Sequence, residues 1–371
     1  ISFHLPANDE SSFLIINARI IDGSGDPSIF ESVRVNGNKI QEVGQLNPQS
    51  GEAIIDGTGL ILSPGFIDTH SHHDGHIFEM PDALSAVSQG ITTIVVGMDG
   101  FSMVPLSNFF TQLENNPVAI NIASYSGHNS LRNMTMGKDY KRLSTQMEMR
   151  NMADLLKQDM KDGALGLSTG LEYDPGLYSE TDEVVDLLKI VSSYKGRYTS
   201  HMRSEDISLE AALDEFIEIS RRTKLPSQIS HIKLAKRSLW GQSPWMIDKL
   251  NRARAEGLDI TADVYPYTFY ESTMRILFAK RDFDNRESAE YALTELVYPD
   301  GLTLSHYDPD PSLIGKTIAE IAAARGKDPA TVLMDLIRED EDETDSAIGV
   351  AMSQPDVNRL MQWEHSNICS D

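Results

Sequence analysis

Two histidines separated by one residue follow an apolar segment early in the chain. His70 and His72 come directly after Gly65-Phe66-Ile67, a run typical of a buried strand. Residues two apart along a strand point to the same side, so both imidazoles can face one metal ion. Two surface histidines at a turn would show the same spacing. The place of His70 and His72 at the end of an apolar strand favours the metal site over the surface turn.

Two more histidines and two carboxylates also end predicted strands. His201 and His231 each close a short β-like stretch, and Asp99 follows the strand predicted at 92–96. Asp371, the last residue given, comes directly after the last predicted strand. Each of these residues alone would more often be a packing or turn residue. Together, Asp99 can bridge two metal ions, and Asp371 can both contact a metal and act as general base.

These four histidines and two carboxylates form a ligand set that suits zinc or another borderline divalent ion. One or two such ions would lower the pKa of a water molecule towards neutrality and polarise a carbonyl oxygen. The residue types therefore predict hydrolysis of an amide, an ester or a related carbonyl compound. They do not distinguish between these substrates.

The elements that must position these residues alternate between strand and helix from Pro64 onward. Eight strands are predicted, at 65–70, 92–96, 118–125, 165–168, 197–201, 227–231, 259–264 and 366–370. Strands that alternate with helices in this way predict an α/β fold, a closed (β/α)8 TIM barrel at residues 64–371. Active sites of such barrels lie at the carboxyl ends of the strands, where the histidines and carboxylates fall.

Two segments depart from this alternation. Residues 1–63 contain short β-rich stretches separated by turn residues, which predicts part of a small β-sandwich too thin to bury a core alone. The connection between the seventh and eighth predicted strands is far longer than an ordinary loop of a barrel. We therefore predict a lid subdomain inserted into the barrel at 272–362.

The composition limits the partners of the protein. The formal net charge of -24 at pH 7 argues against nucleic acid and anionic membranes. No apolar run is long enough to span a bilayer. Cys369 is the only cysteine, so an intrachain disulfide is excluded. The sequence does not decide between the cytoplasm and, if a signal peptide preceded Ile1, the periplasm or the exterior of the cell. It does not predict the oligomeric state either.

Several motifs that occur in order along the chain resemble those of a known family. The segment 64–72, with the sequence PGFIDTHSH, resembles the first-strand signature of the amidohydrolase superfamily. Further segments resemble the D-aminoacylases, which are N-acyl-D-amino-acid deacylases: 89–93, 127–129, 166–171, 201–203, 230–233 and 265–268. The resemblance covers nearly the whole chain from Leu14 onward, including the long connection before the eighth strand.

The resemblance implies a role for each of these residues. His70 and His72 would hold one metal ion, and His201 and His231 would hold the other. Asp371 would take the proton from the attacking water and pass it to the leaving amine. Four residues would bind the substrate: Lys233, Tyr265, His128 and Tyr173.

The chain departs from the family pattern at two places. Asp99 stands where the best-known members carry cysteine. Aspartate is a harder ligand that can bridge two ions through both oxygens, so we expect one or two zinc ions with Asp99 between them. The family continues after Asp371 with an eighth helix and further sandwich strands. We therefore expect a C-terminal segment, or a second polypeptide, to complete the barrel.

The activity that the resemblance implies is metal-dependent hydrolysis of the amide bond of small N-acyl-D-amino acids. The D configuration rests wholly on the resemblance. Another amidohydrolase, acting on cyclic amides or dipeptides, is the first alternative because the same ligand set fits it. The long insertion and the motif at 166–171 favour the deacylase. A non-catalytic metal-binding protein is the second alternative, disfavoured because every expected ligand position holds a competent residue.

Overall fold

The computed structural model describes residues 12–371 of the chain. The chain divides into two compact units, the first ending at Phe66 and the second running from Ile67 to Asp371. Each is described here by itself.

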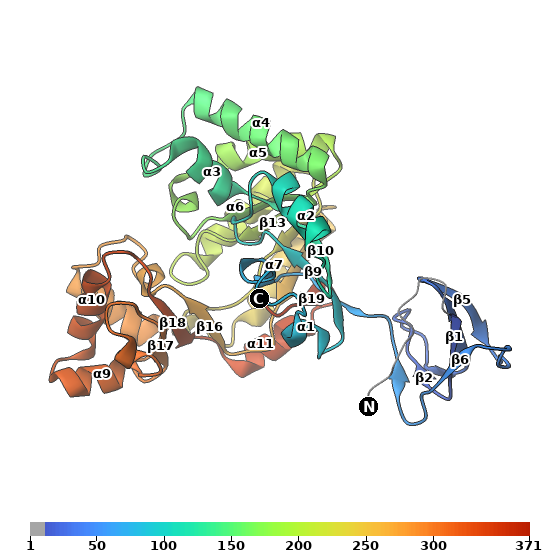
Figure 1. The fold of residues 1–371 in the computed structure, drawn as a ribbon. Helices are drawn as coiled ribbons and strands as arrows, with labels where there is room; N and C mark the ends of the chain where they lie inside the picture. The colour runs from blue at the N-terminus through green and yellow to red at the C-terminus, as the bar shows by residue number, and fades with distance from the viewer. Residues whose placement is uncertain (1–11) are drawn as a thin grey trace. The chain divides into compact units, whose positions relative to one another are not determined.

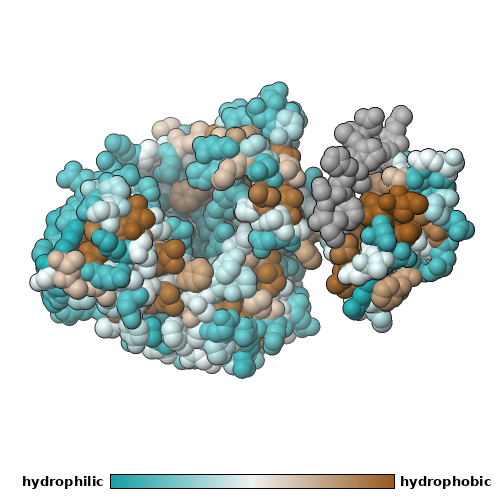
Figure 2. Space-filling view, turned by 60° about the horizontal axis from the view of Figure 1, so that its bottom comes forward, coloured by the Kyte–Doolittle hydropathy of each residue, from teal (hydrophilic) through white to brown (hydrophobic). Residues whose placement is uncertain are grey.

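The first unit consists of short strands in two sheets. One sheet has the order β5-β4-β1-β6 and contains β1 (Ser12–Ile16), β4 (Ser32–Asn36), β5 (Lys39–Gly44) and β6 (Ala53–Asp56). The other has the order β3-β2-β7 and contains β2 (Arg19–Ile20), β3 (Ile29–Phe30) and β7 (Ile61–Leu62). Leu14 and Val33 are buried, whereas Ile40 and Ile61 are exposed, and Figure 2 shows hydrophobic residues on the visible face of this unit. The unit is a thin β module with little core of its own.

The second unit is a barrel whose strands follow chain order: β8 (Phe66–Asp68), β9 (Ile91–Val96), β10 (Asn121–Ser124) with its continuation β11 (Ser126–Gly127), β12 (Gly166–Gly170), β13 (Arg197–His201), β14 (Ser227–Ile229), β15 (Ile260–Val264) and β19 (Ser366–Ile368). Pairing is parallel between β9 and β10 and from β11 through β15 to β19. The ring closes where the amide of Asp371 donates to the carbonyl of His70 at 3.0 Å. The predicted (β/α)8 barrel with an N-terminal β module is confirmed (Figure 1).

Helices surround these strands, and most of them bury apolar side chains in the hydrophobic clusters of the barrel. They are α1 (Leu84–Val87), α2 (Leu106–Asn115), α3 (His128–Met136), α4 (Gln146–Asp162), α5 (Thr181–Ser193), α6 (Leu209–Thr223), α7 (Ser243–Ala255) and α11 (Gln354–Met361), with short turns η1 (His73–Gly75), η2 (Gly176–Tyr178) and η3 (Arg237–Leu239). A reciprocal capping box between Thr145 and Glu148 starts α4, which ends at Gly163 with φ 110°. Within residues 12–371, no helix is long and apolar enough to cross a membrane.

The long connection between β15 and β19 forms a lobe with a core of its own, built around Phe278, Tyr307 and Leu333. The lobe contains β16 (Phe269–Ser272), η4 (Met274–Leu277), α8 (Arg286–Tyr291), η5 (Ala292–Leu296), β17 (Leu302–His306), η6 (Pro311–Leu313), α9 (Ile318–Arg325), α10 (Pro329–Glu339) and β18 (Ser346–Val350). Its sheet has the antiparallel order β16-β18-β17. The predicted insertion at 272–362 also includes α11, but this helix packs against α7, β15 and β19 of the barrel.

Candidate metal centre

The first pair of histidines meets both predicted metal-binding carboxylates at the carboxyl ends of the strands. The Nε2 atoms of His70 and His72 lie 3.3 Å apart. His70 Nε2 is 3.0 Å from Asp371 Oδ1 and 3.4 Å from Asp99 Oδ2. His72 Nε2 is 3.4 Å from that oxygen of Asp371 and 3.5 Å from that of Asp99. The structure therefore brings these four residues together around one position.

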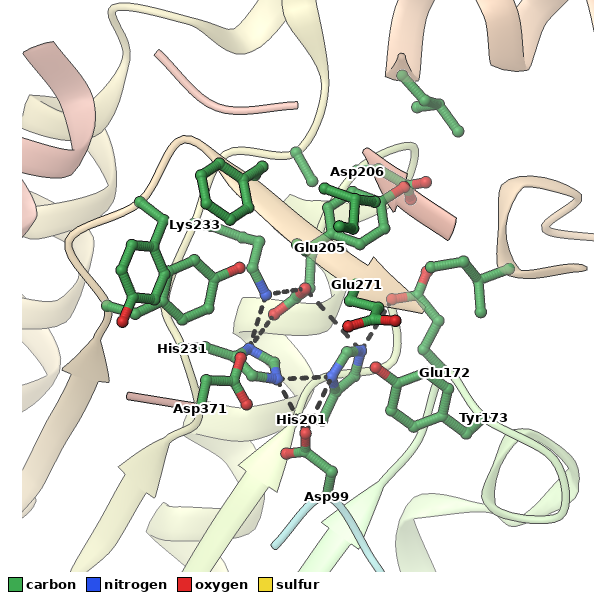
Figure 3. Close-up of a pocket in the computed structure, with 18 of the residues that line it drawn as sticks. Asp99, Glu172, Tyr173, His201, Glu205, Asp206, His231, Lys233, Glu271 and Asp371 are labelled. Atoms are coloured by element: carbon green, nitrogen blue, oxygen red, sulfur yellow. Dashed lines mark hydrogen bonds and ion pairs between the residues drawn. The ribbon is translucent and has the colours of Figure 1, made fainter. Parts of the chain in front are cut away.

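The second pair of histidines approaches the same aspartate from the neighbouring strands. His201 Nδ1 lies 2.9 Å from His231 Nε2. Asp99 Oδ2 is 3.1 Å from His231 Nε2 and 4.0 Å from His201 Nδ1. One carboxylate oxygen of Asp99 therefore lies within 4.0 Å of a nitrogen from each of the four histidines. Figure 3 shows Asp99 next to His201 and His231.

The chemistry of this donor set fits a divalent cation. The ring nitrogens of each histidine pair face each other. A neutral imidazole carries a proton on only one of its two nitrogens, so the facing nitrogens can offer lone pairs to a metal ion. The second oxygen of Asp99, Oδ1, is buried and has no hydrogen-bond partner among the described residues, which is costly for a charged group. Nitrogen and oxygen ligands of this kind suit zinc or a similar ion placed between them.

The two carboxylates of the centre stay ionised, which is the form that binds a metal. Burial raises the pKa of Asp99, but His231 and His70 reverse this effect and hold it well below its ordinary value. Burial also opposes ionisation of Asp371, and the same two histidines again lower its pKa well below the ordinary value. Burial lowers the pKa of His201 to about 4, so this imidazole is neutral and keeps a lone pair for a ligand bond.

The backbone at the centre adopts conformations that side chains other than glycine rarely take. Asp99, His231 and Asp371 have φ values of 51°, 34° and 64°. Such conformations cost roughly 1–3 kcal/mol each and concentrate at functional sites. Gly170 at the end of β12 makes room for the Asp99 turn, since a Cβ at this position would lie 2.0 Å from the Asp99 carbonyl oxygen. The glycine-rich segment 166–171 therefore helps to position the bridging carboxylate.

Carboxylates that the sequence analysis did not single out contact the histidine nitrogens on the side away from Asp99. Asp263 Oδ1 lies 3.2 Å from His70 Nδ1. Glu172 Oε2 lies 3.0 Å from His201 Nε2. A ring nitrogen that donates its proton to a carboxylate leaves the lone pair of the other nitrogen for a metal ion. The signal for Glu172 is its place directly after the segment 166–171.

Glu205 is a third such carboxylate, and it connects His231 to Lys233. Its Oε1 lies 2.8 Å from His231 Nδ1, and its Oε2 lies 2.5 Å from the Lys233 ammonium. Lys233 Nζ is in turn 2.7 Å from His231 Nδ1. Burial raises the pKa of Glu205, but His231 and Lys233 outweigh it and lower the pKa to about 2.

A cavity of about 380 Å³ opens above these side chains. Lys233, Tyr265 and Tyr173, which the sequence analysis assigned to substrate binding, are among the residues that line it. The Tyr173 ring lies 4.3 Å from the ring of His201, between centroids. The Tyr265 hydroxyl is buried and has no hydrogen-bond partner in the described part of the chain. The cavity therefore combines an ammonium, four phenols and most of the candidate metal ligands.

His128, also predicted to bind the substrate, is not among the residues that line this cavity. It is fully buried at the start of α3, and its Nε2 lies 2.8 Å from Glu183 Oε1. Arg132 and Ser144 donate to the same carboxylate at 2.6 Å and 2.5 Å. Burial opposes the charge of Glu183, yet His128 and Arg132 lower its pKa to about 2. In the structure His128 thus joins α3 to α5 in a buried network, and its role in substrate binding stays a prediction.

The Asp99→Asn variant should bind zinc at least about tenfold more weakly than the parent, a change of about 1.4 kcal/mol. Asparagine keeps the size of the side chain but removes the negative charge that faces all four histidines. Competition with a chelator of known zinc affinity measures the change. Asp139→Asn is the matched control because that carboxylate is 75% exposed and pairs with Arg142. Equal zinc affinities for Asp99→Asn and the parent would remove Asp99 from the centre.

Comparisons with known proteins agree with this geometry. The sequence model of the amidohydrolase family matches residues 53–331. The chain is 30% identical over 384 residues to the D-aminoacylase of Alcaligenes xylosoxydans xylosoxydans, a match that covers 96% of this chain and 74% of that protein. It is 32% identical over 374 residues to the N-acyl-D-glutamate deacylase of the same organism, covering 95% of this chain and 72% of that protein.

A solved structure shows the same architecture. The crystal structure of N-acyl-D-glutamate deacylase from Bordetella bronchiseptica superimposes with a TM-score of 0.86 at 30% identity. The match covers 97% of this chain and 75% of that one. That enzyme is complexed with zinc and with a phosphonate inhibitor that mimics the tetrahedral intermediate of its reaction.

Proposed function

Because this chain belongs to the amidohydrolase family, we propose that it is a zinc-dependent hydrolase of N-acyl-D-amino acids. It cleaves the amide bond to give a carboxylate and a free D-amino acid. The observation that supports this most directly is the meeting of four histidines at one oxygen of Asp99, beside a cavity large enough for a small substrate.

The residues of the centre would hold one or two zinc ions. Two groups of candidate ligands share His231: His70, Asp99 and Asp371 join it in one, and His201 and Glu205 join it in the other. His72 lies beside the first group, and Asp99 Oδ2 also lies 4.0 Å from His201 Nδ1. When bound, zinc polarises the amide carbonyl and makes a water molecule more acidic. The contacts of Asp263 and Glu172 with the outer ring nitrogens keep His70 and His201 in the tautomers that this binding requires.

Asp371 is the proton carrier in this proposal. Its pKa is held well below the ordinary value by His70 and His231 against the effect of burial, so it is ionised and accepts the proton of the attacking water. As the new C–O bond forms, Asp371 holds this proton. It then donates the proton to the amide nitrogen while the C–N bond breaks, so the amine leaves as a neutral group and Asp371 is regenerated.

Lys233 and Tyr265 bind the polar groups of the substrate. The Lys233 ammonium is fixed by Glu205 and lies 5.5 Å from the centre of the Tyr265 ring. Burial raises the pKa of the Tyr265 hydroxyl well above its ordinary value, so this group stays protonated and donates a hydrogen bond. Together they supply two donors for the substrate carboxylate or for the carbonyl oxygen, which acquires negative charge during the reaction.

A hydrolysis screen with added zinc tests the proposal. Among N-acetyl derivatives of the same amino acids, the D forms should release free amino acid at least about tenfold faster, in kcat/KM, than the L forms. The D configuration is taken from the two deacylating relatives. A preference for L substrates, or activity on cyclic amides or dipeptides alone, would contradict it and favour another amidohydrolase activity.

A further inference from the structure

Six carboxyl groups and one ammonium are among the groups that line the cavity. Its carboxylates are Asp99, Glu172, Glu205, Asp206, Glu271 and Asp371. Lys233 is the one lysine or arginine on this lining among the described residues, and Glu205 already holds its ammonium at 2.5 Å. Burial, Asp206 and Glu205 raise the pKa of Glu172 well above its ordinary value, and burial raises the pKa of Asp206, so these two groups favour their neutral forms. The carboxylate of an N-acyl amino acid adds a further negative charge.

The lobe between β15 and β19 supplies an apolar wall to the same cavity. Ile276, Leu277, Leu296 and Ile348 line it. Glu271 of β16 is the charged residue that the lobe contributes, and its side chain is drawn among those of the cavity in Figure 3. A wall of this composition offers contact to an apolar chain, with a carboxylate to receive a positive group.

The position of the Glu271 carboxylate is fixed by two hydroxyl groups of the neighbouring strands. Ser305 donates to Oε1 at 2.6 Å and Ser346 donates to the same oxygen at 2.9 Å. Neither donor carries a charge, so the negative charge of Glu271 is not neutralised by these contacts. Glu271 therefore presents a fixed negative charge to whatever occupies the cavity.

The Tyr265 hydroxyl shows independently that the cavity is built to hold a polar ligand. Tyr265 is only 3% exposed, and its hydroxyl has no hydrogen-bond partner within the described chain. A buried donor without a partner is costly, and a ligand acceptor in the cavity would satisfy it. Glu271 therefore borders a ligand site and is not an isolated surface carboxylate.

We infer that this cavity selects N-acyl-D-amino acids with apolar or cationic side chains and rejects those with a carboxylate in the side chain. This inference rests on the proposed function. A side-chain carboxylate would approach Glu271, and the described residues that line the cavity offer it no lysine or arginine other than Lys233, which Glu205 already holds. A side-chain ammonium or guanidinium would meet Glu271. The selectivity would thus differ from that of the N-acyl-D-glutamate deacylases among the relatives.

The test compares kcat/KM of the zinc-loaded protein for N-acetyl-D-leucine, N-acetyl-D-arginine and N-acetyl-D-glutamate. The first two should exceed the third at least about tenfold, since Glu271 is exposed and solvent screens its charge. Glu271→Lys should lower the ratio of arginine to glutamate substrate by at least about tenfold, and the smaller change Glu271→Gln should lower it less. Glu287→Lys is the matched control, an exposed residue of α8 outside the cavity lining.

The outcomes separate this inference from the proposed function. If N-acetyl-D-glutamate is the best of the three substrates, the selectivity is overturned while the deacylase activity stands. If Glu271→Gln leaves the ratio of arginine to glutamate substrate unchanged, Glu271 does not determine selectivity, even where the lysine variant fails to fold. If none of the three substrates is hydrolysed, the proposed function fails, and this inference fails with it.

Discussion

His231→Ala should lose its zinc and hydrolyse N-acetyl-D-amino acids at least about 1,000-fold more slowly than the parent, a loss of roughly 4 kcal/mol in the transition state. His231 Nε2 lies 2.9 Å from His201 Nδ1 and 3.1 Å from Asp99 Oδ2. Alanine therefore removes the residue that belongs to both groups of candidate metal ligands in the structure.

Elemental analysis of the dialysed variant measures the zinc content, and initial rates measure turnover. His201→Ala should give the same result because its Nδ1 faces the same position. His306→Ala is the control, a histidine of the lobe whose side chain is 53% exposed and pairs with Asp308. Zinc contents of His231→Ala and the parent that agree within error would show that the metal is held elsewhere.

The sequence was sufficient to predict the barrel and the residues that meet at its centre, because both depend on local pattern. An apolar strand followed by a polar residue places that residue at the carboxyl end, and a parallel barrel brings all such ends to one face. His70 and Asp371 could thus be expected to meet, although they lie at opposite ends of the barrel sequence. Their 3.0 Å contact follows from ring closure between β8 and β19.

The carboxylates behind the histidines could not be predicted in this way. Asp263 reaches His70 across 193 residues of sequence, from within a strand and not from its end. Glu205 reaches His231 and Lys233 from the loop after β13, where acidic residues are common and most are solvated. Only the folded structure, with its loops packed over the end of the barrel, distinguishes Asp263 and Glu205 from surface carboxylates.

Two features of the structure lay beyond the sequence interpretation for the same physical reason. His128 lies in a segment that resembles a family motif, but its partner Glu183 comes from another helix, so the buried ion pair is visible only in the fold. The helix α11 has the amphipathic pattern of its neighbours in the lobe, yet its apolar face packs on the barrel. A periodic pattern predicts that a helix buries one face, and it does not say against which core.

Asp371→Asn should lower kcat by about 100- to 10,000-fold, the usual contribution of a positioned acid or base. Asparagine cannot accept the proton of the attacking water or return it to the leaving amine. It preserves the shape of a side chain that is 23% exposed and that contacts both His70 and His72. Zinc held between His201, His231 and Asp99 should remain, because Asp371 is not a member of that half of the centre.

The comparison of kcat with zinc content separates loss of the proton carrier from loss of the metal. The variant should retain at least one zinc ion and bind the substrate with a KM within about threefold of the parent, since Lys233 and Tyr265 are unchanged. Glu364→Gln is the matched control, a carboxylate that is 81% exposed two residues before β19. A variant that keeps its zinc and more than about a tenth of the parent kcat would exclude Asp371 as the acid and base, because the carboxylate contributes at least about 100-fold in this mechanism.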